Sequence, residues 1–232
     1  MTTIDTEKDT LVYFPVYGKG ESIRMLLWHA KVEYNDVRVP PPIFRKWKAD
    51  GKLPAGQVPV WIKATNQGDI ENEEGADDIT LPDGPQLNQA SAILRMLGKK
   101  HGYVPEDPVE GYHVDWAIET YQDIFSSGIN LNWFKESLDE EQLAKIETQF
   151  ANWNQLIEKK LSQMGTKFLA GDKITIGDFI VFSEYASVAV NDRPVREAQQ
   201  AACAKALEDS PAVTAWVKAM KEELKEYLEE RP

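Results

Sequence analysis

The sequence LVYFPVYGKGESIRMLL, residues 11–27, decides how the chain begins to fold. Its first four residues have the β-branched and aromatic side chains that favour a strand, and Pro15 then removes a backbone donor and ends it. Gly18 and Gly20 favour a turn. Apolar side chains then recur every three or four residues, and Glu21 in the first turn suits the helix dipole. We therefore expect a strand, a glycine turn and an amphipathic helix in direct succession.

Tyr13 lies near the end of the predicted strand, just before the helix. In open α/β sheets ligands bind outside the carboxyl ends of the strands, so a hydroxyl at this position is well placed for chemistry. The same position also fits a half-buried core tyrosine. The residue pattern alone leaves both interpretations open.

The string YFPVYGK from Tyr13 to Lys19, followed by IRMLL at residues 23–27, closely resembles the opening of cytosolic glutathione transferases of the tyrosine type, nearest to the pi and sigma classes. In that family this tyrosine holds the thiolate of glutathione. The resemblance therefore implies that Tyr13 is the catalytic residue. Lys19 stands where the family usually has arginine. Its ammonium group would add positive charge but cannot donate the two parallel hydrogen bonds of a guanidinium.

Two further segments match the family in the same order. Gly56–Pro59 resembles the segment whose proline is cis, which implies that the Val58 backbone pairs with the cysteinyl unit of glutathione. Gln89 and Ala90 begin a helix where the family has Gln-Ser, the pair that holds the γ-glutamyl carboxylate. Ala90 lacks the serine hydroxyl, but the N–H groups and dipole of a helix N-terminus still attract an anion.

The resemblance implies further glutathione contacts in the first domain. Between Phe44 and Gly56 a small insertion leaves the alignment open. Lys48 is the candidate for the glycyl carboxylate, with Trp47 and Lys52 as alternatives. The γ-glutamyl end would be held by Gln57, Gln89 and the Ala90 N–H.

The remaining implied contacts involve a second subunit and a second substrate. Asp123 falls where the partner subunit of a homodimer offers an acid to the γ-glutamyl amine, although the pattern fits an exposed helix acid equally well. The second substrate is expected to be a small apolar electrophile. It would lie against Phe14, Val16 and Trp133.

Composition narrows the class of partner. With 26 basic and 38 acidic residues the net charge is −12, whereas nucleic acids and anionic membranes attract clusters of Lys and Arg. The one cysteine, Cys203, forms no internal disulfide, and one Cys with three His offers no metal-ligand spacing. The polar N-terminus and the lack of an apolar run near about 20 residues argue against a signal peptide and a membrane helix. We expect a cytoplasmic protein without a metal, a nucleic-acid partner or a membrane.

The order strand, helix, strand, helix, strand, strand, helix predicts a thioredoxin-like α/β domain over residues 1–102. The C-x-x-C redox motif is absent. Residues 64–86 interrupt this domain with seven acidic side chains and no basic one. Such a composition predicts a solvated, partly disordered loop. A calcium loop fits less well, because the glycine comes one place late and the closing glutamate is missing.

Strand signals disappear after residue 102, and an all-helical domain is predicted over residues 109–232. Apolar side chains recur at helical spacing through long runs. Thr175 and Asp178 form a capping box before an apolar run, which in the family begins the buried helix of the C-terminal domain. Pro211 is expected to begin the last helix.

We therefore predict a glutathione transferase that conjugates the glutathione thiolate to apolar electrophiles, with glutathione as co-substrate. The resemblance also implies a homodimer. Two alternatives stay open: a sigma-like isomerase that acts on a lipid endoperoxide with the same residues, and a non-catalytic structural or ligand-binding protein of the same fold. The non-catalytic alternative stays open because the chain departs from the family pattern at Lys19, at Ala90 and in the acidic insertion.

Overall fold

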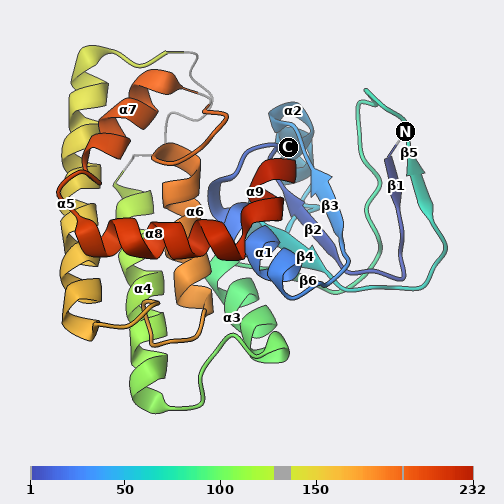
Figure 1. Cartoon of the computed structure of the whole chain (residues 1–232). Helices are drawn as coiled ribbons and strands as arrows, with labels where there is room; N and C mark the ends of the chain where they lie inside the picture. Colours follow the sequence, from blue (N-terminus) through green and yellow to red (C-terminus); the bar gives the residue numbers. More distant parts are fainter. Residues whose placement is uncertain (1, 128–136, 195, 232) are drawn as a thin grey trace. The chain divides into compact units, whose positions relative to one another are not determined.

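The computed structural model describes residues 2–127, 137–194 and 196–231. The chain divides into two compact units, Met1–Leu97 and Gly98–Pro232, each visible in Figure 1. This division falls within helix α3 (Ala90–His101). In the described part of the chain, no helix combines the length and the apolar character needed to cross a membrane.

The N-terminal unit contains a mixed four-stranded sheet with the strand order β3-β2-β4-β6. Strand β2 (Thr10–Tyr13) is parallel to β3 (Asn35–Arg38) and antiparallel to β4 (Val60–Ile62). Strand β4 is also antiparallel to β6 (Gln86–Asn88). The predicted thioredoxin-like arrangement is confirmed.

Helices cover this sheet on two sides. The helices that accompany it are α1 (Gly18–His29), α2 (Pro41–Ala49), the short 3-10 helix η1 (Pro54–Gly56) and the first part of α3. Because successive side chains along a strand point to opposite faces, Val12 and Tyr13 serve different faces. Val12 joins Ile43 and Trp47 of α2 in a buried apolar cluster. Tyr13 points to the other face, where its ring contacts Gly20 of α1.

The acidic segment 64–86 is largely exposed, as predicted, but it is not a loop throughout. Its residues Ile70–Asn72 form strand β5, which pairs antiparallel with β1 (Thr2–Ile4) in a separate two-stranded sheet. Both strands are seen at the right of Figure 1. The Thr3 hydroxyl donates to the Glu71 carboxylate across this pair.

Apolar and amide contacts fasten the rest of the segment. Ile70, Ile79 and Leu81 pack against the buried cluster under α2. The buried Asn72 amide accepts a hydrogen bond from the Thr80 N–H at 2.7 Å and donates to the Thr80 carbonyl at 3.2 Å. Three apolar side chains and one amide therefore hold a segment whose average composition is that of a solvated loop.

The C-terminal unit is all-helical in its described residues. Helices α4, α5 and α6 lie side by side, and α8 crosses them in Figure 1. The helices are α4 (Pro108–Ser126), α5 (Glu140–Met164), α6 (Ile176–Val188), α7 (Glu197–Lys205), α8 (Pro211–Glu223) and α9 (Lys225–Glu230). Pro211 begins α8, as predicted, but α8 is not the last helix, because the backbone leaves the helical conformation at Leu224 and α9 follows.

Asp178 connects three segments of the helical unit. Its carboxylate accepts hydrogen bonds from the Thr175 N–H and hydroxyl, both at 2.9 Å, which confirms the predicted capping box. It also accepts from the Leu169 N–H at 2.9 Å and from Trp216 Nε1 at 3.0 Å. Burial raises the pKa of Asp178 above its ordinary value, while these four donors oppose that rise.

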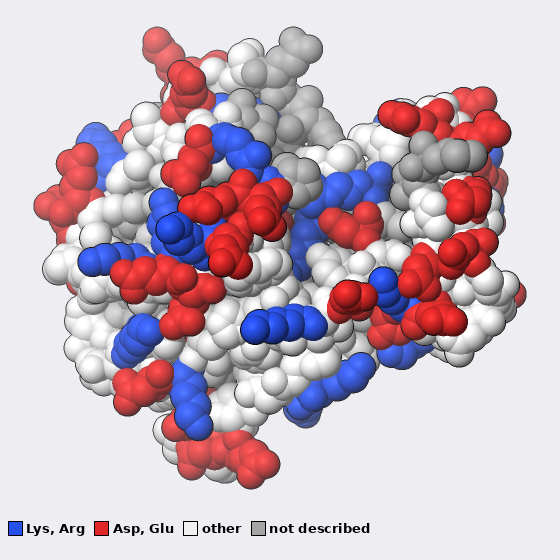
Figure 2. Space-filling view, turned by 45° about the vertical axis from the view of Figure 1, so that its right-hand side comes forward, with Lys and Arg blue, Asp and Glu red and all other residues white. Residues whose placement is uncertain are grey.

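Charged side chains are mixed over the surface shown in Figure 2, where acidic and basic groups lie next to one another. In the N-terminal unit, the Asp9 carboxylate pairs with Lys63, and Asp36 pairs with Arg38. Acidic side chains outnumber basic ones in the chain, and some of them are paired with lysine or arginine.

Replacing Asn72 by Ala tests whether the acidic segment is fastened as described. The substitution removes both hydrogen bonds to the Thr80 backbone, so the free energy of unfolding should fall by about 1 to 3 kcal/mol. Urea denaturation followed by circular dichroism measures the change. Glu73→Ala, an exposed neighbour in the same segment, should stay within about 0.5 kcal/mol of the unmodified protein. Equal effects of the two substitutions would contradict the assignment.

Candidate active site

Three strand ends meet at one edge of the four-stranded sheet. The register pairs Val12 with Val60 and Val60 with Asn88. Because β4 runs against both of its neighbours, the residues before β4 lie beside the ends of β2 and β6. Tyr13 and Gln89, far apart in the sequence, are thereby brought to either side of the turn into β4.

The turn into β4 and the start of α3 form two sides of this edge. The Val58–Pro59 peptide bond is cis, as the resemblance implied. Val58 is half-buried and Gln57 is exposed. Gln89 has a φ of 73°, and its carbonyl accepts the Ile93 N–H at 2.9 Å. Helix α3 therefore begins at this edge, where its first N–H groups and the positive end of its dipole favour an anion.

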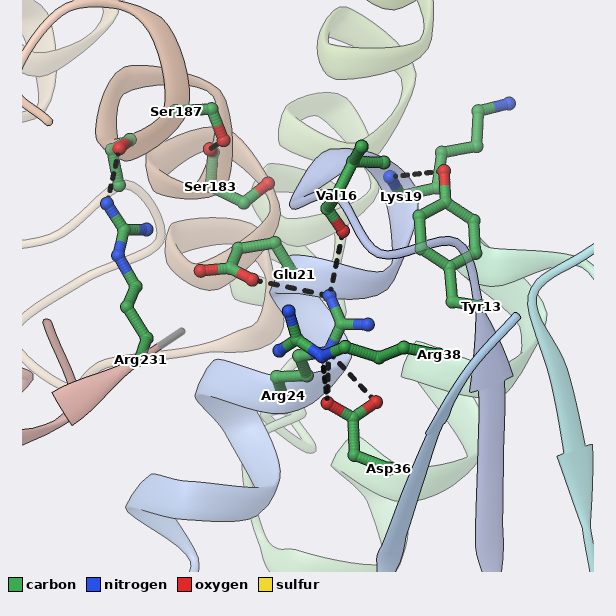
Figure 3. Close-up of polar contacts among 11 residues, drawn as sticks. Tyr13, Val16, Lys19, Glu21, Arg24, Asp36, Arg38, Ser183, Ser187 and Arg231 are labelled. Atoms are coloured by element: carbon green, nitrogen blue, oxygen red, sulfur yellow. Dashed lines mark hydrogen bonds and ion pairs between the residues drawn. The ribbon is translucent and has the colours of Figure 1, made fainter. Parts of the chain in front are cut away.

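Tyr13 is held against the beginning of α1, as Figure 3 shows. Its hydroxyl oxygen accepts a hydrogen bond from the Lys19 backbone N–H at 3.0 Å, and only 6% of the residue is exposed. A Cβ atom at Gly18 would lie 2.7 Å from the Tyr13 hydroxyl oxygen, and one at Gly20 would lie 2.7 Å from the ring. Both glycines therefore allow the ring to approach the helix. A hydroxyl that accepts one hydrogen bond keeps its own proton as a donor.

Lys19 contacts Tyr13 through its backbone. In Figure 3 the Lys19 side chain extends away from the Tyr13 hydroxyl. Burial lowers the pKa of the Lys19 ammonium below its ordinary value. The described contact between the two residues is thus a backbone hydrogen bond at a helix N-terminus rather than a contact with the Lys19 charge.

Arg24, which the sequence analysis missed, holds the turn that leads from Tyr13 into α1. Its guanidinium donates to the Val16 carbonyl at 3.1 Å and through Nε to both Asp36 oxygens at 3.0 and 3.2 Å. The Glu21 carboxylate lies 3.5 Å from Nη1. Figure 3 shows this network, in which Arg24 is 1% exposed. One signal was present in the sequence, since Glu21 precedes Arg24 by the three residues typical of a helical ion pair.

The three candidates for the glycyl carboxylate differ in their surroundings. Trp47 is fully buried, and its Nε1 donates to the Asp78 carboxylate at 2.6 Å. Lys52 Nζ donates to the same carboxylate at 3.1 Å. Lys48 is exposed, and its methylene carbons lie beside Gly56 in the turn before β4. Lys48 therefore lies beside the turn before β4, whereas Trp47 and Lys52 both donate hydrogen bonds to Asp78 of the insertion.

The residues expected around the second substrate and the partner subunit come from both units, and each is described within its own unit. Phe14 is half-buried, with its ring centroid 4.8 Å from that of Phe44, and Val16 is also half-buried. Asp123 is exposed on α4 of the helical unit. Trp133 lies outside the described residues.

A mixed sheet with a cis-proline at its edge, followed by an all-helical unit, defines a protein of the thioredoxin-like α/β plus helical class. Residues 122–231 match the family model described as "Glutathione S-transferase, C-terminal domain". Over 223 residues the chain is 26% identical to Glutathione S-transferase P 1 of Xenopus laevis, an alignment that covers 94% of this chain and 90% of that protein. The chain is therefore similar to glutathione S-transferases over its C-terminal domain and along most of its length, and these relatives support a glutathione transferase enzyme.

Two solved structures illustrate the likeness of the fold. The glutathione S-transferase from Ascaris lumbricoides superimposes with a TM-score of 0.74 at 22% identity, covering 97% of this chain and 98% of that one. The structure of prostaglandin synthase D of Nilaparvata lugens gives a TM-score of 0.69 at 25% identity, with the same coverage of 97% and 98%.

Replacing Arg24 by Met tests its part in holding the turn. The substitution leaves the buried Glu21 carboxylate without its guanidinium, so the free energy of unfolding should fall by about 3 to 5 kcal/mol. Thermal and urea denaturation measure the loss. Arg38→Met removes the more exposed guanidinium on Asp36, and it should cost no more than about 1 kcal/mol. A small effect of Arg24→Met would contradict the role assigned to Arg24.

Proposed function

We propose that the protein conjugates the thiolate of glutathione to small apolar electrophiles and that the Tyr13 hydroxyl stabilises this thiolate. The observation that supports the proposal best is the hydrogen bond from the Lys19 N–H to the Tyr13 hydroxyl oxygen at the start of α1. A hydroxyl that accepts a hydrogen bond is polarised and becomes a better donor. The helix dipole at the same end favours a nearby negative charge.

The chemical step requires the ionised form of glutathione. A free thiol has a pKa near about 8.5, so only a small fraction is thiolate at neutral pH. A hydrogen bond from Tyr13 to the sulfur stabilises the anion and lowers the pKa of the bound thiol. The thiol proton passes to solvent. The thiolate then forms the carbon–sulfur bond while the leaving group departs with its electron pair, and Tyr13 keeps its own proton.

The edge of the sheet would hold the rest of glutathione. The backbone of Val58, before the cis Pro59, would pair with the cysteinyl unit. Lys48, beside that turn, would take the glycyl carboxylate. The γ-glutamyl end would be bound by Gln57, Gln89 and the N–H of Ala90, and the positive end of the α3 dipole compensates in part for the missing serine hydroxyl.

The second substrate would lie against Phe14 and Val16, both of which are half-buried near Tyr13. Apolar walls of this kind favour an apolar electrophile. An isomerase that rearranges a lipid endoperoxide with glutathione is the second candidate function. The likeness to the structure of prostaglandin synthase D favours it. Product analysis with a model electrophile and with an endoperoxide separates the two activities.

Tyr13→Phe tests whether the Tyr13 hydroxyl takes part in catalysis or only in the fold. The substitution keeps the ring packing but removes a charge-assisted hydrogen bond worth about 1.5 to 3 kcal/mol. The rate of conjugation near pH 7 should therefore fall by roughly ten- to a hundredfold. The pKa of the bound thiol, followed by thiolate ultraviolet absorbance, should rise toward the free value, so the defect should shrink as pH increases.

Tyr17→Phe is the matched control, because Tyr17 is also buried and lies in the turn before α1. It should leave the rate nearly unchanged. If Tyr17→Phe abolishes conjugation and Tyr13→Phe does not, the catalytic tyrosine is Tyr17. If the unmodified protein binds glutathione but neither conjugates nor isomerises, a non-catalytic ligand-binding role replaces the proposal.

We also propose a homodimer, because Asp123 is exposed on α4 and stands where the family's partner subunit offers an acid to glutathione. Sedimentation equilibrium at micromolar concentration should give twice the chain mass of 26.3 kDa. A mass equal to a single chain would contradict the dimer and leave Asp123 as an exposed helix acid.

A further inference from the structure

Asp78 lies at the centre of an ion cluster that the proposed function does not use. One of its oxygens accepts hydrogen bonds from Trp47 Nε1 at 2.6 Å and from the Ile79 N–H at 3.0 Å. The other lies 2.9 Å from Lys46 Nζ and 3.1 Å from Lys52 Nζ. These donors, Lys46 foremost, hold the pKa of Asp78 well below its usual range. The carboxylate therefore stays charged throughout the neutral range.

The chain on either side of Asp78 is fastened to the N-terminal unit. Ile79, the next residue, packs against the buried cluster under α2. Thr80 exchanges two hydrogen bonds with the Asn72 amide, which belongs to β5. The Asp78 carboxylate is therefore brought to α2 by packing and backbone contacts, in addition to its charge.

The donors around Asp78 form a set suited to a carboxylate: one indole N–H and two ammonium groups. Trp47 and Lys52 are two of the three residues that the family resemblance offers for the glycyl carboxylate of glutathione. The indole of Trp47 has one hydrogen and serves one strong acceptor at a time. A ligand carboxylate that approached these donors would also meet the negative charge of Asp78.

We propose that the Asp78 carboxylate competes with the glycyl carboxylate of glutathione for the donors Trp47 and Lys52. The acidic insertion thereby sets how much the glycyl carboxylate contributes to the affinity for glutathione. This inference rests on the proposed function. Glutathione either displaces Asp78 from Trp47 and Lys52 or binds with its glycyl end on Lys48 alone. In both cases the protein gains less from the glycyl carboxylate than the same chain would without the Asp78 charge.

Asp78→Asn tests the competition with little change of shape. The Asn oxygen can still accept a hydrogen bond from Trp47 Nε1, but the ammonium groups of Lys46 and Lys52 no longer face a negative charge. Calorimetry should compare two ligands, glutathione and glutathione whose glycyl carboxylate is converted to an amide. Glutathione should bind Asp78→Asn about tenfold more tightly than the unmodified protein, as estimated from one charged hydrogen bond. The amide should change by less than about threefold.

Asp77→Asn is the matched control, because it removes the same charge from an exposed neighbour in the insertion. It should leave the affinity for both ligands within about twofold, since exposed charges that are not in contact are screened by salt. Circular dichroism and the thermal midpoint establish that each variant is folded. If Asp78→Asn does not fold, Lys46→Gln replaces it with the opposite expected sign: Asp78 keeps its charge and loses one ammonium partner, so glutathione should bind more weakly than to the unmodified protein while its amide changes less.

The outcomes separate this inference from the proposed function. The inference is overturned if folded Asp78→Asn binds glutathione with unchanged affinity, or if glutathione and its amide gain equally. Asp78 would then serve only to hold the insertion against α2. Failure of every folded protein to bind either ligand overturns the proposed function and this inference together. Binding of glutathione by Asp78→Asn but not by the unmodified protein supports the competition in its strongest form.

Discussion

The antiparallel pairing of β4 with both of its neighbours is the constraint on which the candidate site depends. A strand that runs against β2 and β6 must begin where they end, so the turn at Val58–Pro59 lies between Tyr13 and the start of α3. A hydroxyl, an extended backbone and a helix N-terminus thereby share one edge. A register shift of one residue would turn the side chains of a strand to the opposite face, so this arrangement exists only in one pairing.

Much of the fold could be predicted because its signals are local. The strand that contains Tyr13 is ended by Pro15, and the capping box of Thr175 and Asp178 acts across three residues. The predicted succession of strands and helices along the first domain is found, with β1 and β5 as additional strands. The cis bond before Pro59 has no signal in composition or periodicity, and it was expected only from the family resemblance.

The missed features depend on contacts between distant residues. Mean composition suggested disorder in the acidic insertion, yet Ile70, Ile79 and Leu81 reach a core that other segments build. Strand β1 is too short to be recognised, and its partner lies 68 residues further along the chain. The family resemblance likewise offered Trp47 as a donor, but nothing in the sequence indicated that Asp78 would be its acceptor.

The pairing of β1 with β5 gives the first few residues an influence on a distant part of the unit. Ile4 is fully buried in the same apolar cluster as Trp47, and β1 is bonded directly to the segment that leads to Asp78. Recombinant forms that trim this end, or that carry a purification tag ahead of Thr2, therefore change the support of that segment. Affinities measured on proteins with different N-terminal extensions should not be treated as interchangeable.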